Sequence, residues 1–90
     1  MREIVRFKFD KSFDHGVVED DVCLAIFCAE ALHGKSRVRL EVGGFLVSPD
    51  GSSCVLDIRG PAGEDTAKIF AGLSTARVGD EAFKVERVEP

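Results

Sequence analysis

The segment from Val17 to His33 constrains the fold more than any other, because it contains the longest apolar run in the chain. Every residue from 22 to 29 is apolar or a thiol. Helical spacing of about 100° per residue gathers one apolar stripe, which we predict to face the core: Val18, Val22, Ala25, Ala29 and Leu32. No run approaches the ~18 apolar residues needed to span a bilayer, so we predict a packed helix.

The opposite side of this helix is also apolar, which is unusual for a surface helix. Four residues gather there: Cys23, Leu24, Phe27 and Ala31. Burial of a Leu or Phe side chain contributes about 1.5–3 kcal/mol, so exposure of both would cost a small domain much of its stability. Either a second helix covers this side, or it contacts another subunit, most simply a second copy.

Alternating patterns predict the strands of an α+β fold. Residues 2–9 alternate, a second run from 37 to 47 is interrupted by Gly43-Gly44, and the turn 48–52 starts a returning strand. A second amphipathic helix begins at Gly60-Pro61, and a last strand covers 81–89. We therefore predict one domain, residues 1–90, with a ferredoxin-like split βαβ (βαββαβ) fold, in which a four-stranded antiparallel sheet carries two helices on one face. The double glycine predicts a bulge.

The alternation predicts a basic open sheet face. Seven of the twelve basic residues fall on it, in a chain of net charge -4: Arg2, Arg6, Lys8, Arg37, Arg39, Arg59 and Lys84. Three acids join them, Glu41, Asp57 and Glu86. This face is a solvated surface, a site for an anion or acidic partner, or a sheet-to-sheet dimer contact.

The predicted fold is similar to that of RNA-recognition domains, which stack bases on aromatic side chains of the central strands. The alternation predicts that Phe7 and Phe9 of the first strand point into the core and not onto the open sheet face, so RNA binding is disfavoured. The chain also has no Asn, Gln, Tyr or Trp. Charges, hydroxyls, backbone and aliphatic groups must therefore make its contacts.

The loop before the first helix resembles that of ACT-type regulatory domains, through Asp14, His15 and Gly16 and the βαββαβ order. The resemblance implies a small-ligand module using the Asp14–Val18 loop at a dimer interface. His15 before a helix also resembles phosphocarrier proteins of the HPr type, but the Arg and Pro of that motif are missing, and that function is not inferred.

The spacing of the residues gives no support for catalysis or for metal binding. Cys23 and Cys28 lie about 140° apart round a helix and cannot share a metal ion, and Cys54 points inward on a strand. Acylphosphatases share the predicted topology but use an Asn that this chain lacks. We predict no catalytic residues, no metal and no cofactor.

These patterns favour a non-catalytic domain that acts through self-association, as a homodimer, or through a protein partner. Three cysteines and a charged N-terminal segment predict a cytoplasmic protein with no membrane partner. The alternatives are an ACT-like ligand module and an anion- or RNA-binding face.

Overall fold

The computed structural model describes residues 2–10 and 14–88 and has an α+β fold. Its four strands form one antiparallel sheet in the order β2-β3-β1-β4. The elements, in chain order, are β1 (Glu3–Phe9), α1 (His15–His33), α2 (Lys35–Glu41), β2 (Val42–Val47), β3 (Ser53–Ile58), α3 (Gly60–Val78), a 3₁₀ turn (Asp80–Ala82) and β4 (Phe83–Val88).

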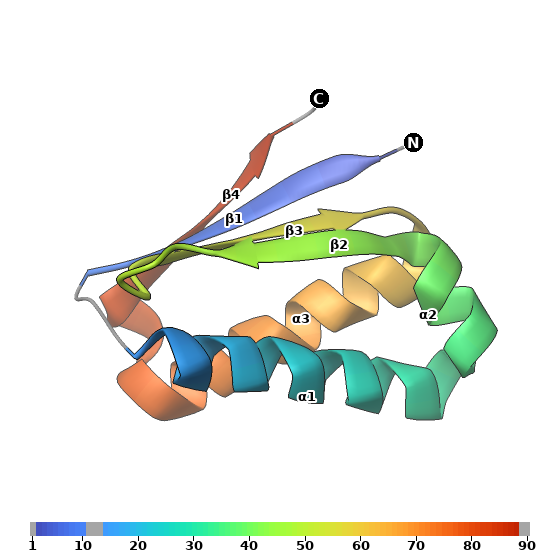
Figure 1. Ribbon diagram of the computed structural model, residues 1–90, viewed down its shortest axis with the longest axis horizontal. Helices are drawn as coiled ribbons and strands as arrows, with labels where there is room; N and C mark the ends of the chain where they lie inside the picture. The colour runs from blue at the N-terminus through green and yellow to red at the C-terminus, as the bar shows by residue number, and fades with distance from the viewer. Residues whose placement is uncertain (1, 11–13, 89–90) are drawn as a thin grey trace.

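The molecule has two layers. Helices α1 and α3 lie side by side beneath one face of the sheet, and the opposite face is open (Figure 1). Helix α2 follows α1 at one end of the molecule and leads directly into β2. Because β2 and β4 are the outer strands in the strand order, each of them forms a free edge of the sheet.

The core lies between the sheet and the two long helices. Val5 and Phe7 of β1 are fully buried, as the alternation predicts. The ring of Phe7 meets Phe70 of α3 edge to face, with centroids 4.7 Å apart. Val22 and Ala25 of α1 complete this contact region, because their stripe faces the sheet. The central strand and both long helices are thus joined by one apolar cluster.

The predicted turn between β2 and β3 is confirmed. Gly51 has a φ of 72°, and its amide donates to the Ser48 carbonyl at 2.9 Å. Asp50 accepts hydrogen bonds from Ser52 and Ser48, which hold the pKa of its carboxyl at about 2. The predicted bulge is also present, because the β2–β3 register shifts between Val42 and Gly44.

The predicted strand beginning at residue 37 is wrong, because residues 35–41 form helix α2. Arg37 and Arg39 therefore lie on a helix and not on the open sheet face. Arg37 bonds Glu41 one turn later, with Nε 2.8 Å from Oε2. Val38 packs into a small cluster with Ala29 and Ala62. The long side chains of Arg37, Arg39 and Glu41 favour a helix. Val38 is the one buried residue of this short segment, and a single buried residue fits the period of a helix and that of a strand equally well.

Helix α1 ends at His33 as predicted, but it begins two residues before the predicted start at Val17, and one residue of its predicted stripe is exposed. It begins at His15, so Asp20 and Asp21 lie beyond its first turn. Asp21 is only 8% exposed and accepts a bidentate hydrogen bond from Arg77 of α3, at 2.7 and 2.9 Å. Leu32, predicted to be buried, is 70% exposed. The four residues before it in the predicted stripe are buried as expected.

Candidate functional site

The outer side of α1 is uncovered. We call Cys23, Leu24, Phe27 and Ala31 the helix patch; all four are exposed. Phe27 is 67% exposed and Leu24 45% exposed. Helix α3 packs beside α1 on the side of Asp21, so it does not cover this patch. The possibility that the second helix buries this side is thus wrong, and the patch is solvent-accessible in the single chain.

The edge strand β2 is the second apolar surface. Its sequence, VGGFLV, has no charged residue and no proline. Natural edge strands usually carry charges or proline, which prevent pairing with other chains. The opposite edge, β4, follows this rule with Lys84, Glu86 and Arg87. The β2 edge therefore lacks the protection that the β4 edge has. The alternating pattern does not distinguish β2 from the other strands, although its uncharged stretch is visible in the sequence.

The backbone of β2 offers hydrogen-bonding groups to solvent. Ser48 N donates to Ser53 O at 2.9 Å, so the backbone N–H of Ser48 points toward β3. This bond determines which residues of β2 direct their backbone groups to β3 and which direct them to the free edge. Successive residues of an antiparallel strand direct their polar backbone groups to opposite sides. Leu46 therefore faces β3, and Phe45 and Val47 direct their N–H and C=O groups to the free edge. An extended strand from another chain would be able to form backbone hydrogen bonds with these groups.

A hollow flanks β2 on each side of the sheet. The helix-side hollow, about 270 Å³, is lined by Ile26, Glu30, Val38, Arg39, Val42, Gly44 and Phe45. The open-face hollow, about 260 Å³, is lined by Gly44, Phe45, Leu46, Val55 and Asp57. Side chains of an added strand alternate between the two faces of a sheet. The two hollows therefore lie where such side chains would go.

The helix-side hollow reaches α1 on the flank between its buried stripe and the helix patch. Ile26 of α1 lines the helix-side hollow together with Phe45. At 100° per residue, Glu30, Cys23 and then Phe27 follow Ile26 round the helix, away from the buried stripe. The hollow thus ends beside the Cys23 margin of the helix patch, whereas Phe27 lies opposite the buried stripe. Figure 1 shows β2 with the α1 helix below it.

The open sheet face is basic but largely paired. Arg6, Lys8 and Lys84 occupy it with the acids Asp57 and Glu86, and Arg2, just before β1, bonds Asp57 there. Arg59 follows the end of β3 and donates to the Leu40 carbonyl of α2. Glu86 lies within ion-pair distance of both Arg6 and Lys8, at 3.7 and 3.2 Å. Lys84 lies directly opposite Lys8 in the register and has no ion-pair partner within the described residues. Of the basic residues predicted for this face, Arg2, Arg6, Lys8 and Lys84 therefore lie on it, Arg59 lies at its end, and Arg37 and Arg39 lie on α2.

The predicted ligand loop is occupied by its own hydrogen bonds. The Asp14 carboxylate caps α1 by accepting from the amides of Gly16, at 2.8 Å, and Val17, at 3.4 Å. His15 Nδ1 lies 3.0 Å from Ser48 O, and Nε2 lies 2.9 Å from Glu19 Oε2. These contacts tie the start of α1 to the β2–β3 turn. They use the polar groups that a ligand would need, so they give the ACT-like prediction no support.

The histidines and cysteines are dispersed. His33 Nε2 lies 2.7 Å from Asp65 of α3, far from His15. Cys54 is buried, and this burial raises the pKa of its thiol to about 12, so it is a poor nucleophile at neutral pH. Within residues 2–10 and 14–88, no group of three or more His, Cys, Asp or Glu could hold a metal ion. Helices in the same described part of the chain are too short or too polar to cross a membrane.

No protein-family model matches this chain, and no curated protein matches it in sequence. The candidate site is therefore defined by its geometry alone. It is an uncharged strand edge with a hollow on either side, beside an uncovered apolar helix.

Proposed function

We propose that this chain is a non-catalytic association domain that forms a homodimer by pairing β2 with the β2 of a second copy. The observation that carries the proposal is the uncharged β2 edge, flanked by two hollows, one of which is also lined by Ile26 and Glu30 of α1. Antiparallel pairing about a two-fold axis would extend the sheet across both copies. Such an isologous contact uses the same surface twice and closes on itself.

A second β2 has side chains suited to both hollows. Phe45 lies opposite Leu56, a core residue, and so points to the helix side of the sheet. Leu46 lies opposite Val55, points to the open face and is 72% exposed. In a two-fold pair, each copy offers one Phe for the helix-side hollow and one Leu for the open-face hollow. The surface is therefore complementary to itself in its apolar groups.

Charge at the rim of the helix-side hollow also favours a second copy. Glu30 and Arg39 both line this hollow, and neither has an ion-pair partner within residues 2–10 and 14–88. A two-fold contact brings the Glu30 of one copy toward the Arg39 of the other. Rim charges of this kind contribute mainly to orientation and association rate.

We also propose that the α+β arrangement is a variant of the ferredoxin-like split βαβ, with α2 inserted before β2. Support comes from β1 lying between β3 and β4, and from α1 and α3 sharing one face (Figure 1). Three free cysteines support a reducing compartment such as the cytoplasm.

Sedimentation velocity over a range of concentrations tests the dimer. The wild-type chain should shift from monomer to dimer as concentration rises. Leu46→Lys places a charge on the β2 edge, and Phe27→Asp places one on the helix patch; each should weaken dimerisation by about tenfold or more. Both side chains are exposed, so neither change should unfold the monomer.

Leu32→Asp is the matched control. Leu32 is as exposed as Phe27 on the same helix, but it lies toward α3 and away from β2. This variant should dimerise like the wild type. A wild-type monomer at high micromolar concentration contradicts the proposal, and so does equal loss of dimer in all three variants.

A further inference from the structure

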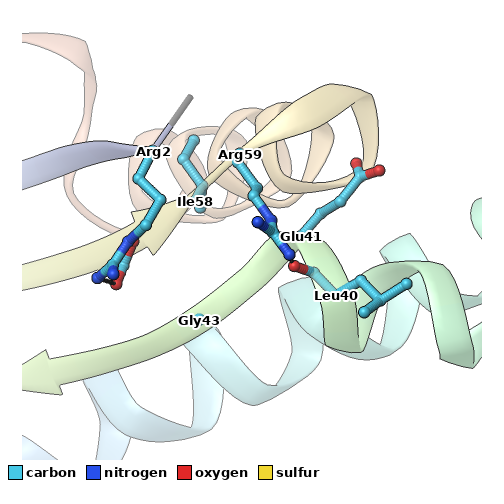
Figure 2. Close-up of a pocket in the computed structure, with 7 residues that line it drawn as sticks. Arg2, Leu40, Glu41, Gly43, Ile58 and Arg59 are labelled. Atoms are coloured by element: carbon cyan, nitrogen blue, oxygen red, sulfur yellow. Dashed lines mark hydrogen bonds and ion pairs between the residues drawn. The ribbon is translucent and has the colours of Figure 1, made fainter.

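A separate pocket of about 250 Å³ opens at the end of the sheet where β2 begins. It is lined by Arg2, Leu40, Glu41, Gly43, Asp57, Ile58 and Arg59. Figure 2 shows Arg2 and Arg59 flanking Ile58, with both guanidinium groups extending toward β2. The two arginines come from opposite parts of the chain and are brought together by pairing of β1 with β3.

Each guanidinium is anchored through its Nε atom. Arg2 Nε donates to Asp57 Oδ1 at 3.1 Å, and Arg2 Nη2 bonds the other oxygen of that carboxylate. Arg59 Nε donates to the Leu40 carbonyl at 2.9 Å. The Nη1 group of Arg2 and both Nη groups of Arg59 have no bond among the described residues. The anchors fix the planes of the two cations and leave their outer donors available.

The carboxylates of the pocket are already engaged. Asp57 is paired with Arg2, and Glu41 bonds both Arg37 and the Ala62 amide, the latter at 2.6 Å. Glu41 thereby occupies the N-terminus of α3, as an external anion would. Arg59 has no carboxylate partner within residues 2–10 and 14–88. The pocket therefore has one uncompensated cation beside a second, oriented one.

The contact between Asp57 and Arg2 depends on the absence of a side chain at Gly43. A Cβ atom at Gly43 would lie 3.0 Å from Asp57 Oδ2 and 3.2 Å from its Cγ, tighter than most real contacts. The small residue lets the Asp57 carboxylate lie against β2 and hold Arg2 in place. An alanine there would push Asp57 away and release Arg2 from its orientation.

We propose that this pocket binds a small molecule through an oxyanion group, a carboxylate or a phosphate, held between Arg2 and Arg59. Guanidinium groups recognise such oxyanions through paired N–H donors, and anchored ones lose little freedom on binding. No aromatic side chain lines the pocket, so stacking of a nucleic-acid base finds no platform. This inference is independent of β2 pairing.

The test is an NMR titration of the full chain with inorganic phosphate and, separately, with acetate, at constant ionic strength set by chloride. Either anion should shift the Gly43 amide and the Arg59 Nε–H signal in a saturable way. The anion that binds more tightly identifies the ligand class. Arg59→Gln should weaken binding by about tenfold or more, because it removes charge-assisted hydrogen bonds. Arg2→Gln and Gly43→Ala should each weaken it less.

Lys84→Gln is the control. It removes the same charge from the same sheet face, outside the pocket, and should leave the affinity nearly unchanged. Equal loss in Lys84→Gln and Arg59→Gln overturns the proposal, because binding would then be diffuse. Absence of saturable shifts with both anions in the wild type overturns it without reference to any variant. If the NMR spectrum shows that Arg59→Gln is unfolded, Arg2→Gln takes its place. Weaker binding in Arg2→Gln than in Lys84→Gln then supports the proposal, and equal loss in the two variants overturns it.

Discussion

His15 shows how one side chain can fasten two elements. Its ring lies between the Ser48 carbonyl and the Glu19 carboxylate, which are both acceptors. Both ring nitrogens can donate only when both carry protons, that is, in the imidazolium form. The hydrogen bond to Ser48, followed by that to Glu19, therefore raises the pKa of His15 above its usual 6.5. The result is a pH-dependent link between α1 and the β2–β3 turn.

The sign of the pH effect follows from this raised pKa. Protonated His15 stabilises the fold fully below the unfolded value of 6.5, and this stabilisation is lost as pH rises through the folded pKa. Urea unfolding should therefore show wild-type stability falling relative to His15→Gln over that window. The pKa of His15, measured by NMR, should drop in Glu19→Gln. A wild-type value at or below 6.5 contradicts the account.

Some residue contacts had no local signal in the sequence. Asp21 and Arg77 lie 56 positions apart, and only the packing of α1 on α3 brings them together. Asp21 resembled an ordinary acid near a helix start, and Arg77 an ordinary base near a helix end. The same holds for the pocket arginines, since alternation predicted that Arg2 and Arg59 share a face but not that both are anchored by Nε. Pairwise contacts of this kind depend on side-chain geometry that periodicity does not encode.

The tight approach of α3 to the α2–β2 junction is the clearest packing constraint at the level of elements. A Cβ at Gly63 would lie 2.6 Å from the Glu41 carbonyl oxygen and 2.9 Å from Ile58 Cβ. These neighbours are backbone and a buried strand residue, so they cannot move aside easily. Gly63 therefore permits the contact that also lets Glu41 bond the start of α3.

Two glycines of the same helix should respond oppositely to alanine. Gly63→Ala should lower the free energy of unfolding by about 1–3 kcal/mol, because it overpacks this junction. Gly72→Ala should raise it by about 0.5–1 kcal/mol, because nothing lies within 4 Å of the added Cβ and alanine favours helix. Urea denaturation midpoints measure both. Similar changes in the two variants would contradict this packing.

At the level of elements, long periodic segments were predictable and short ones were not. Both long helices, the hairpin turn and the bulge were predicted correctly from period, Pro and Gly positions. Helix α2 was missed because Val38 and Val42 are four residues apart, a spacing that suits one face of either a strand or a helix. The helix patch was identified from sequence, whereas the β2 edge needed the strand order, which shows which strands lie at the margins.

At the scale of the whole molecule, the two sheet edges differ in chemistry. The β4 edge carries charges that discourage pairing, whereas the β2 edge has none and adjoins two hollows. The proposed dimer would cover the apolar edge, and the arginine pocket adjoins it, because Asp57 lines both that pocket and the open-face hollow.

Amide hydrogen exchange as a function of protein concentration tests the pairing of β2 most directly. The Phe45 and Val47 amides face the free edge, so they should exchange rapidly in dilute samples and become protected as the dimer forms. The Val85 amide, on the outward side of β4 by the same alternation from the Asp10–Ala82 hydrogen bond, should exchange rapidly at every concentration. Dimerisation without protection of Phe45 and Val47 would contradict the account, as would equal protection of Val85.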